Sequence, residues 1–362
     1  GPVGSRLPIM QGTSFAFVGV LAGLAATQGL SVALTSCIIA GLIHFALGSI
    51  ITSIRSWFPP LVTGLVILAI GLYLIPVGIK YAAGGAAAFQ MNAPEWGDFS
   101  KWGLALVVIF VSLGIKFFTR GTMSSAAILI GLIAGYIVGY FTGAVNLGGV
   151  SKAAWFAIPQ PFKYGIEFSA YAIIGMCLMS IVSAIETVGD ISGIAKGGAN
   201  REATDKELSG GTYADGVGSF IAGLFGGLPN TSFSQNVGLI SMTGVMSRSV
   251  VTLGALFLVA CGLIPKVGAV VAAMPISVLG GGVIVMFGMV VSAGISMLAD
   301  VNWNRRNMII LAMSMSIGLG LQAVPKSMQH LPDSLEMLMV SGLLPAAAIA
   351  VVLNLLIPEE TD

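Results

Sequence analysis

Long apolar runs separated by short polar stretches recur along the whole chain. A membrane-spanning helix needs about 20 apolar residues, and a backbone that faces lipid has to satisfy its own hydrogen bonds as a helix. The pattern therefore predicts an all-α polytopic membrane protein. The predicted membrane segments are residues 14–28, 30–54, 58–79, 102–119, 122–142, 167–189, 211–226, 231–245, 248–264, 275–298, 306–324 and 334–357.

Three of these segments, 14–28, 211–226 and 231–245, are short and rich in Gly, Ser, Thr and Asn. The first and the third begin with stretches of extended character, so we expect each of these two to be a short strand followed by a half-helix. The polar stretch 191–209 has mixed charge and is predicted to be a solvated loop.

The composition agrees with this class. Hydrophobic residues make up 56% and charged residues 9% of the chain, whereas a soluble domain carries roughly 25% charged residues. The three Cys lie in apolar runs and suggest no disulfide framework, and the two His are too far apart for a His-based metal cluster. The net charge of +1 gives no reason to expect nucleic-acid binding. No catalytic motif is present, so we do not expect an enzyme.

The distribution of positive charge predicts the orientation. If the residues before the first segment are cytoplasmic, ten of the 16 Lys and Arg residues, including every Arg, lie on the inside. The positive-inside rule favours this arrangement, which also places the C-terminus in the cytoplasm.

Self-comparison indicates an internal repeat. Residues 13–15 (Thr-Ser-Phe) recur at 231–233, and the match of 64–67 with 281–284 has nearly the same offset. The two copies would run in opposite directions, which is typical of secondary transporters with broken helices. Two segments precede Thr231 but none precedes Thr13. We therefore expect a seven-plus-seven inverted-repeat transporter whose first two helices are absent from this chain.

Two carboxylic acids, Glu186 and Asp215, lie within predicted membrane segments, and Asp190 follows Glu186 by one helical turn. Ionisable groups in a membrane are costly and usually functional, and a buried carboxyl group can carry a proton near neutral pH. The alternative is that Glu186 and Asp215 are polar contacts between helices. Asp190 is either a coupling residue or an interfacial charge.

The stretch 228–238 is dense in hydrogen-bonding groups, and Pro229 interrupts any helix there. The amides of Gln235 and Asn236 each offer a donor and an acceptor, which suits the edge of a planar heterocycle. Phe15 and Phe233 could stack on such a ring. Alternatively, these polar side chains only satisfy the broken backbone.

Two further features are predicted to be structural. His44 lies in the middle of a segment without an evident partner and is interpreted as a packed core histidine. The Gly280–Gly282 cluster is expected to allow close contact between helices.

Residues 235–244 resemble the signature of the nucleobase–ascorbate transporter family, also called nucleobase–cation symporter-2: Gln/Glu-Asn-x-Gly-x4-Thr followed by Gly, Lys or Arg. Residues 11–15, 185–190 and 214–216 support the resemblance, which covers the chain from the family's third helix to its fourteenth.

The resemblance implies seven-plus-seven inverted segments that are divided into a core domain and a gate domain. The implied core parts are 1–54 (helices 3–4) and 165–265 (helices 8–11), and the implied gate parts are 55–164 (helices 5–7) and 266–362 (helices 12–14 and a cytoplasmic tail).

The resemblance also implies roles for individual residues. Glu186 would hydrogen-bond the base, Gln235 would recognise its other edge, and Asp215 would support proton coupling. The candidate substrate-binding residues are Ser14, Phe15, Glu186, Phe233, Ser234, Gln235 and Asn236; the candidate proton-coupling residues are Glu186, Asp190 and Asp215.

Uracil carriers of this family resemble the pattern with Glu at the position of Gln235, and xanthine and uric acid carriers the pattern with Gln. The chain is therefore expected to be a proton-coupled purine symporter that imports xanthine, uric acid or both by alternating access. It would act in the inner membrane as a homodimer, with the proton as coupling ion and no other cofactor. The alternatives are a carrier of uracil, another nucleobase or ascorbate in the same family, and an anion transporter of the same architecture.

Overall fold

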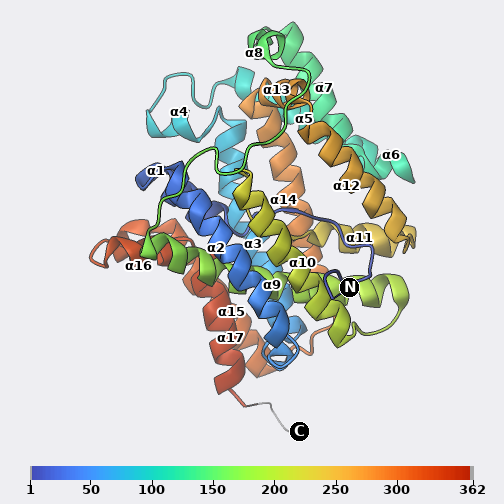
Figure 1. Cartoon of the computed structure of the whole chain (residues 1–362), viewed down its shortest axis with the longest axis vertical. Coiled ribbons are helices and arrows are strands. Elements are labelled where there is room, and N and C mark those ends of the chain that lie inside the picture. The colour runs from blue at the N-terminus through green and yellow to red at the C-terminus, as the bar shows by residue number, and fades with distance from the viewer. Residues whose placement is uncertain (1, 359–362) are drawn as a thin grey trace. The chain divides into compact units, whose positions relative to one another are not determined.

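Helices make up most of the chain, and the only strands in its described part are two of three residues each (Figure 1). The computed structural model describes residues 2–358, apart from the side chains of residues 241, 242, 333 and 334. The chain divides into two units. The first unit comprises Gly1–Tyr73, Gln160–Val251 and Val290–Asp362, and the second unit comprises Leu74–Pro159 and Thr252–Met289.

The first unit holds both strands and the helices that pack on them. Its elements are β1 (Gln11–Thr13), α1 (Val18–Thr27), α2 (Leu30–Ile50), the 3₁₀ helix η1 (Arg55–Trp57), α9 (Ala170–Ala199), α10 (Asp205–Leu224), β2 (Asn230–Ser232), α11 (Ser234–Thr243), α15 (Arg305–Ala323), the 3₁₀ helix η2 (Pro325–Met328), α16 (Asp333–Val340) and α17 (Leu343–Leu356).

The second unit contains α4 (Ala86–Gln90), α5 (Phe99–Phe118), α6 (Thr122–Ser125), α7 (Ala127–Phe141), α8 (Gly148–Lys152) and α13 (Pro265–Ala272). Three helices have residues in both units: α3 (Pro60–Ala82), α12 (Arg248–Gly262) and α14 (Ile276–Leu298).

Each predicted membrane segment contains a helix, but the helices differ in length. In the described part of the chain, five are long and apolar enough to cross a membrane: α2, α3, α5, α9 and α14. A sixth candidate is the pair α12–α13, which bends by 88°. The two strand-plus-half-helix segments are confirmed as β1 followed by α1 and β2 followed by α11, and each half-helix has 10 residues. Such a half-helix is too short to span a bilayer alone.

The prediction of a solvated loop at 191–209 is wrong for most of its length, because α9 continues to Ala199 and α10 begins at Asp205. Asn200 ends α9 in the left-handed conformation with φ 52. Thr204 and Glu207 then form a capping box that starts α10. Charged residues at the end of α9 and at the start of α10 give this stretch the polar composition of a loop.

The two strands form one antiparallel pair, in which Gln11 lies opposite Ser232, Gly12 opposite Thr231 and Thr13 opposite Asn230. Two backbone hydrogen bonds extend the pair at its ends. The Ser14 N–H donates to Pro229 at 2.8 Å, and the Phe233 N–H donates to Met10 at 3.0 Å. The pair therefore joins the beginning of the chain to the region between α10 and α11.

Helices α2, α9 and α10 lie side by side in the first unit (Figure 1). Glycines allow residues 38–48 of α2 and 213–223 of α10 to approach closely. A Cβ atom on Gly41 would lie 2.5 Å from the backbone nitrogen of Phe220, closer than packed atoms tolerate. The contacts along this interface, each written as glycine and neighbour, are Gly41–Phe220, Gly48–Tyr213, Gly216–Phe45 and Gly223–Ile38. Their order shows that α2 and α10 run antiparallel.

The second unit has its own apolar core, in which Leu104 and Val108 of α5 pack with Val278 of α14. The expected close contact at Gly280–Gly282 is confirmed, because a Cβ atom on Gly281 would collide with the backbone of Ala105.

Candidate functional site

The strand pair brings four of the predicted substrate-binding residues together. Ser14 and Phe15 follow β1, while Phe233 and Ser234 follow β2. Because the pair continues through the bonds of Ser14 and Phe233, these residues flank the two ends of one short ribbon. Both serines are buried. The sequence repeat thus places its two Ser-Phe elements, Ser14–Phe15 and Ser232–Phe233, at opposite ends of the same ribbon.

The half-helices start at this ribbon without side-chain caps. Phe17 precedes α1 and Phe233 precedes α11, and neither side chain accepts a hydrogen bond from its helix. The first N–H groups of a helix have no partner within it and carry a partial positive charge. The start of α11 therefore offers donors for an electron-rich or anionic ligand.

The three predicted proton-coupling residues lie next to β2. Ser232 donates its hydroxyl to Asp190 Oδ2 at 2.8 Å, and Thr231 donates its hydroxyl to Glu186 Oε2 at 3.4 Å. Asp190 has 0% and Glu186 5% of its surface exposed. Consecutive hydroxyls of one strand thus hold two acids from successive turns of α9.

The carboxyl group of Asp215 comes from α10 and completes the cluster. It accepts a hydrogen bond from the Thr187 hydroxyl at 2.5 Å. Glu186 lies close enough to both Asp190 and Asp215 to interact with them electrostatically. We call Glu186, Asp190 and Asp215 the acid cluster.

No Lys or Arg forms an ion pair with the acid cluster in the part of the chain that the structure describes. The ion pairs found there involve other acids: Arg55–Glu202, Arg55–Asp205, Lys196–Asp300 and Arg201–Glu207. No group of His, Cys, Asp and Glu within the described residues has a geometry that could hold a metal ion. Buried carboxylates normally need a cation, a metal or a proton. In this arrangement a proton is the simplest source of neutralisation.

The two amides after β2 have different surroundings. Asn236 donates its side-chain N–H to the backbone oxygen of Pro8 at 2.8 Å, so half of its amide ties α11 to the segment before β1. Gln235 is half-buried, and its amide makes no hydrogen bond within the described residues. Gln235 therefore keeps both a donor and an acceptor for a ligand.

The two phenylalanines are also in unlike positions. The Phe233 ring lies against Gly12 of the opposite strand, because a Cβ atom on Gly12 would be 2.7 Å from its Cζ atom. Phe233 therefore packs on the ribbon itself. Phe15 is half-buried and stands just before α1.

Sequence reasoning missed three hydroxyl groups that contact the acids: Thr187, Thr231 and Ser232. Thr187 directly follows Glu186, and the other two lie in the polar stretch 228–238, so each is next to residues that the sequence did indicate. Their polar character within apolar segments was the available signal, but only the fold shows which hydroxyl meets which acid.

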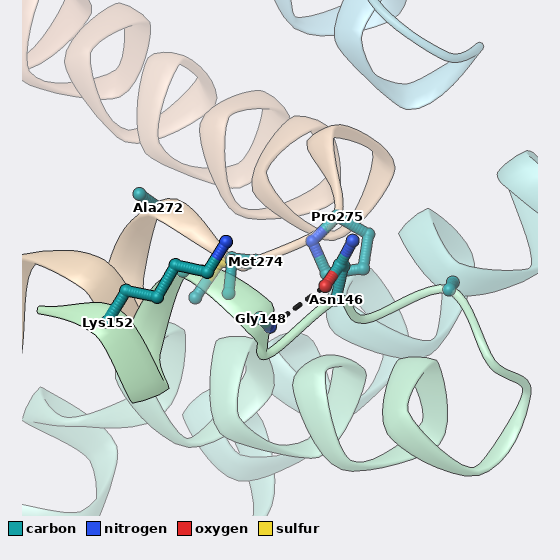
Figure 2. Close-up of a pocket in the computed structure, with 9 residues that line it drawn as sticks. Asn146, Gly148, Lys152, Ala272, Met274 and Pro275 are labelled. Atoms are coloured by element: carbon teal, nitrogen blue, oxygen red, sulfur yellow. Dashed lines mark hydrogen bonds between the residues drawn. The ribbon is translucent and has the colours of Figure 1, made fainter.

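An open pocket with a volume of ≈ 540 Å³ lies elsewhere, in the second unit. Figure 2 shows Asn146 and Lys152 on one side and Ala272, Met274 and Pro275 on the other. Lys152 is the only ionisable residue among those that line it, and none of the predicted site residues does so. The residues with candidate chemistry are therefore those around the strand pair.

Known proteins are similar to this chain along most of its length. A model of the permease family matches residues 2–327. A putative purine permease of Clostridium perfringens is 37% identical over 99% of this chain and 78% of its own length. The xanthine permease of Bacillus subtilis is 36% identical over 97% of this chain and 80% of its own length. A uric acid transporter of Escherichia coli is 37% identical over 97% of this chain and 73% of its own length.

Solved structures with little sequence similarity share the fold. The transmembrane domain of the cyanobacterial bicarbonate transporter BicA matches with a TM-score of 0.59 and 15% identity, over 96% of this chain and 84% of that one. SLC26A9 matches with a TM-score of 0.61 and 14% identity, over 96% of this chain and 57% of that one.

Proposed function

The chain belongs to the nucleobase–ascorbate transporter family, and from this premise we propose that it is a proton-coupled symporter that imports xanthine and uric acid. Membership makes the chain a multi-pass membrane permease for nucleobases and not an enzyme. The substrate, the coupling ion and the mechanism are the proposed parts.

The similarity to permeases named for xanthine and uric acid supports a purine substrate. The free amide of Gln235 supports it as well, because an amide can both donate to and accept from the edge of a purine. In this proposal Glu186 binds the other edge of the base. Ser14, Phe15, Phe233, Ser234 and Asn236 complete the proposed binding site.

The observation that carries proton coupling is the acid cluster: three buried carboxyl groups beside β2 that form no ion pair with Lys or Arg in the described chain. In this proposal Glu186 takes up a proton and the base from the outside, while Asp190 and Asp215 set the charge around it. The proton is the coupling ion, and no other cofactor is involved. The membrane potential then contributes about 2.3 kcal/mol per 100 mV for each inward charge.

Transport by alternating access would use the core and gate domains that the sequence predicts for a seven-plus-seven inverted-repeat transporter. This division concerns movement, so it is a separate proposal from the two units described above. The proposal includes an inner-membrane location, a cytoplasmic C-terminus and a homodimer. The likeness to a bicarbonate transporter concerns the fold, and no feature of the site favours anion transport over nucleobase transport.

Uptake of labelled xanthine by cells that produce the protein, with and without a protonophore, tests the function. We expect saturable uptake that the protonophore abolishes and that unlabelled uric acid, but not uracil, blocks. Absence of both xanthine and uric acid uptake, from protein shown to reach the membrane, would overturn the purine assignment. Uptake that survives the protonophore would overturn proton coupling alone.

A further inference from the structure

His44 lies in the middle of α2 and is almost completely buried, with 1% of its surface exposed. Neither nitrogen of its ring has a hydrogen-bond partner among the described residues. Buried polar atoms without a partner are rare in proteins, and each of them calls for an explanation. A core histidine that only fills space would ordinarily have one ring nitrogen bonded.

Buried polar atoms on the two neighbouring helices also lack a partner in the described chain, namely Ser183 Oγ and Asp190 Oδ1 on α9 and Asp215 Oδ1 on α10. The other oxygen of Asp215 is the one that Thr187 binds. Three different helices therefore contribute unpartnered polar groups.

The helix contacts place these groups at similar depth. Ser180 of α9 donates its hydroxyl to Ala40 of α2 at 3.1 Å. A second contact involves residues that precede Ala40 and Ser180 in the sequence: the Glu167 N–H donates to the Thr35 hydroxyl at 3.1 Å. Helices α2 and α9 therefore run in the same direction. With a rise of about 1.5 Å per residue, His44 lies about 6 Å beyond Ala40, and Ser183 lies about 4.5 Å beyond Ser180.

Asp215 reaches the same level from α10. Its neighbour Gly216 packs against the backbone of Phe45, which directly follows His44. Gly41 faces α10, because it packs against Phe220, and Ala40 faces α9, because it accepts the hydrogen bond of Ser180. His44, three residues after Gly41 and four after Ala40, points into the angle between these two helices.

We propose that His44 is a proton-relay residue, which exchanges a proton with the free oxygen of Asp215 at a buried polar site completed by Ser183. In the exchange, an N–H of the imidazolium ring releases its proton, and Asp215 Oδ1 receives it. The pair changes from imidazolium and carboxylate to neutral imidazole and neutral carboxylic acid. Its net charge stays zero, which avoids an isolated charge in the membrane interior.

The charged surroundings are consistent with this role. The titratable side chains near this level are Glu186 on α9 with Asp190 one turn further, and Asp215 with Tyr213 on α10, while α1 supplies none. These acids are the groups with which His44, the only imidazole among them, would exchange a proton. His44 would thus connect the acid cluster to the α2 side of the bundle, a role that rests on the proposed proton coupling.

The test uses the purified full chain in liposomes loaded with unlabelled xanthine. Exchange of labelled for unlabelled xanthine needs no net proton movement, whereas uptake driven by a proton gradient does. We expect His44→Gln to retain exchange and to lose about 100-fold in gradient-driven uptake, the lower end of what a positioned proton-transfer group contributes. Its uptake should also become flat with pH. His330→Gln is the matched control, because His330 is the other histidine of the chain and is exposed.

Gradient-driven uptake by His44→Gln with the pH profile of the wild type would overturn the relay. A second measurement covers the case in which the variant does not fold. Nitrogen-15 NMR of labelled histidine in the wild-type protein and in His330→Gln identifies the signal of His44. We expect Asp215→Asn to change the protonation of that signal across the pH range, and an unchanged titration would overturn the link. If the wild type carries neither xanthine nor uric acid, the proposed function fails, while the NMR result still decides the pairing of His44 with Asp215.

Discussion

The two strand-plus-half-helix segments share one layout, a strand of three residues and a half-helix of 10 residues, but differ in their contacts. In the second copy, Thr231 and Ser232 donate hydroxyl groups to two acids, and α11 begins with Ser234 and Gln235. In the first copy, the Ser14 hydroxyl is buried without a hydrogen-bond partner in the described chain. Helix α1 is apolar up to its last residue. The repeated geometry places both segments at the site, but one copy supplies nearly all of the chemistry.

This difference indicates how a repeated fold can become specialised. The first copy pairs with the second through backbone atoms, which almost any sequence can provide. The second copy needs particular side chains. Substitutions in the second copy should therefore impair transport, whereas equivalent substitutions in the first should act mainly through packing.

The largest effect is expected from Glu186→Gln, which removes the acid that Thr231 contacts. The amide can still accept a hydrogen bond but cannot take up a proton. We expect a folded protein whose accumulation of xanthine falls to background, measured as uptake under a proton gradient. Normal accumulation would contradict the coupling role of Glu186.

A smaller effect should distinguish the two copies directly. Ser232→Ala removes a buried bond to Asp190 and should lower stability by about 2 kcal/mol. Ser14→Ala removes a hydroxyl that has no partner in the described chain and should be nearly neutral. Thermal unfolding of the two variants measures the difference, and equal losses would show that the copies are not specialised in this way.

Gln235→Glu tests recognition by the second copy. An ionised carboxylate only accepts hydrogen bonds, so the donor to the purine edge is lost. We expect xanthine to bind about fivefold more weakly, or ~1 kcal/mol, as measured by competition with labelled substrate. Gln28→Glu, at the end of α1, is the control in the first copy. If Gln235→Glu binds xanthine with unchanged affinity, the Gln235 amide does not recognise the base by donating a hydrogen bond.

The smallest effect concerns Glu207, an acid outside both copies. Unlike the acid cluster, Glu207 forms an ion pair, with Arg201. Arg201 holds the pKa of Glu207 down from 4.5 to about 2. Glu207 thus contributes stability that is complete above pH 4.5 and is lost as the pH falls towards 2. Because water screens the Arg201 side chain, which is 44% exposed, although that of Glu207 is only 11% exposed, Glu207→Gln should cost no more than about 1 kcal/mol. Thermal unfolding against pH measures it, and a wild-type slope retained in Glu207→Gln would rule out this origin.

The sequence predicted the class, the two strands and the acids, because these depend on local signals. A carboxyl group in an apolar run, as at Glu186 or Asp215, is conspicuous without a structure. Pro229 and the polar residues after it likewise mark the break before α11. The Ser-Phe elements of the repeat indicated that residues far apart in sequence belong together.

The rest depends on packing between distant segments. Nothing near Ser232 in the sequence indicates that it meets Asp190, because the contact follows from the register of β2 against α9. His44 was interpreted as a packing residue because its candidate partners lie on α9 and α10. The stretch 191–209 was mistaken for a loop because charged helix ends and loops have similar compositions.

The strand pair also has a consequence for biosynthesis. Asn236 and Pro8 are 228 residues apart, and their hydrogen bond belongs to the same junction as β1 and β2. During translation, β1 emerges long before the segment that satisfies its backbone. Until β2 is made, the nascent chain has to shelter these unpaired groups from lipid. The centre of the permease is therefore assembled late, so a ribosome that stalls before residue 230 leaves a chain without it.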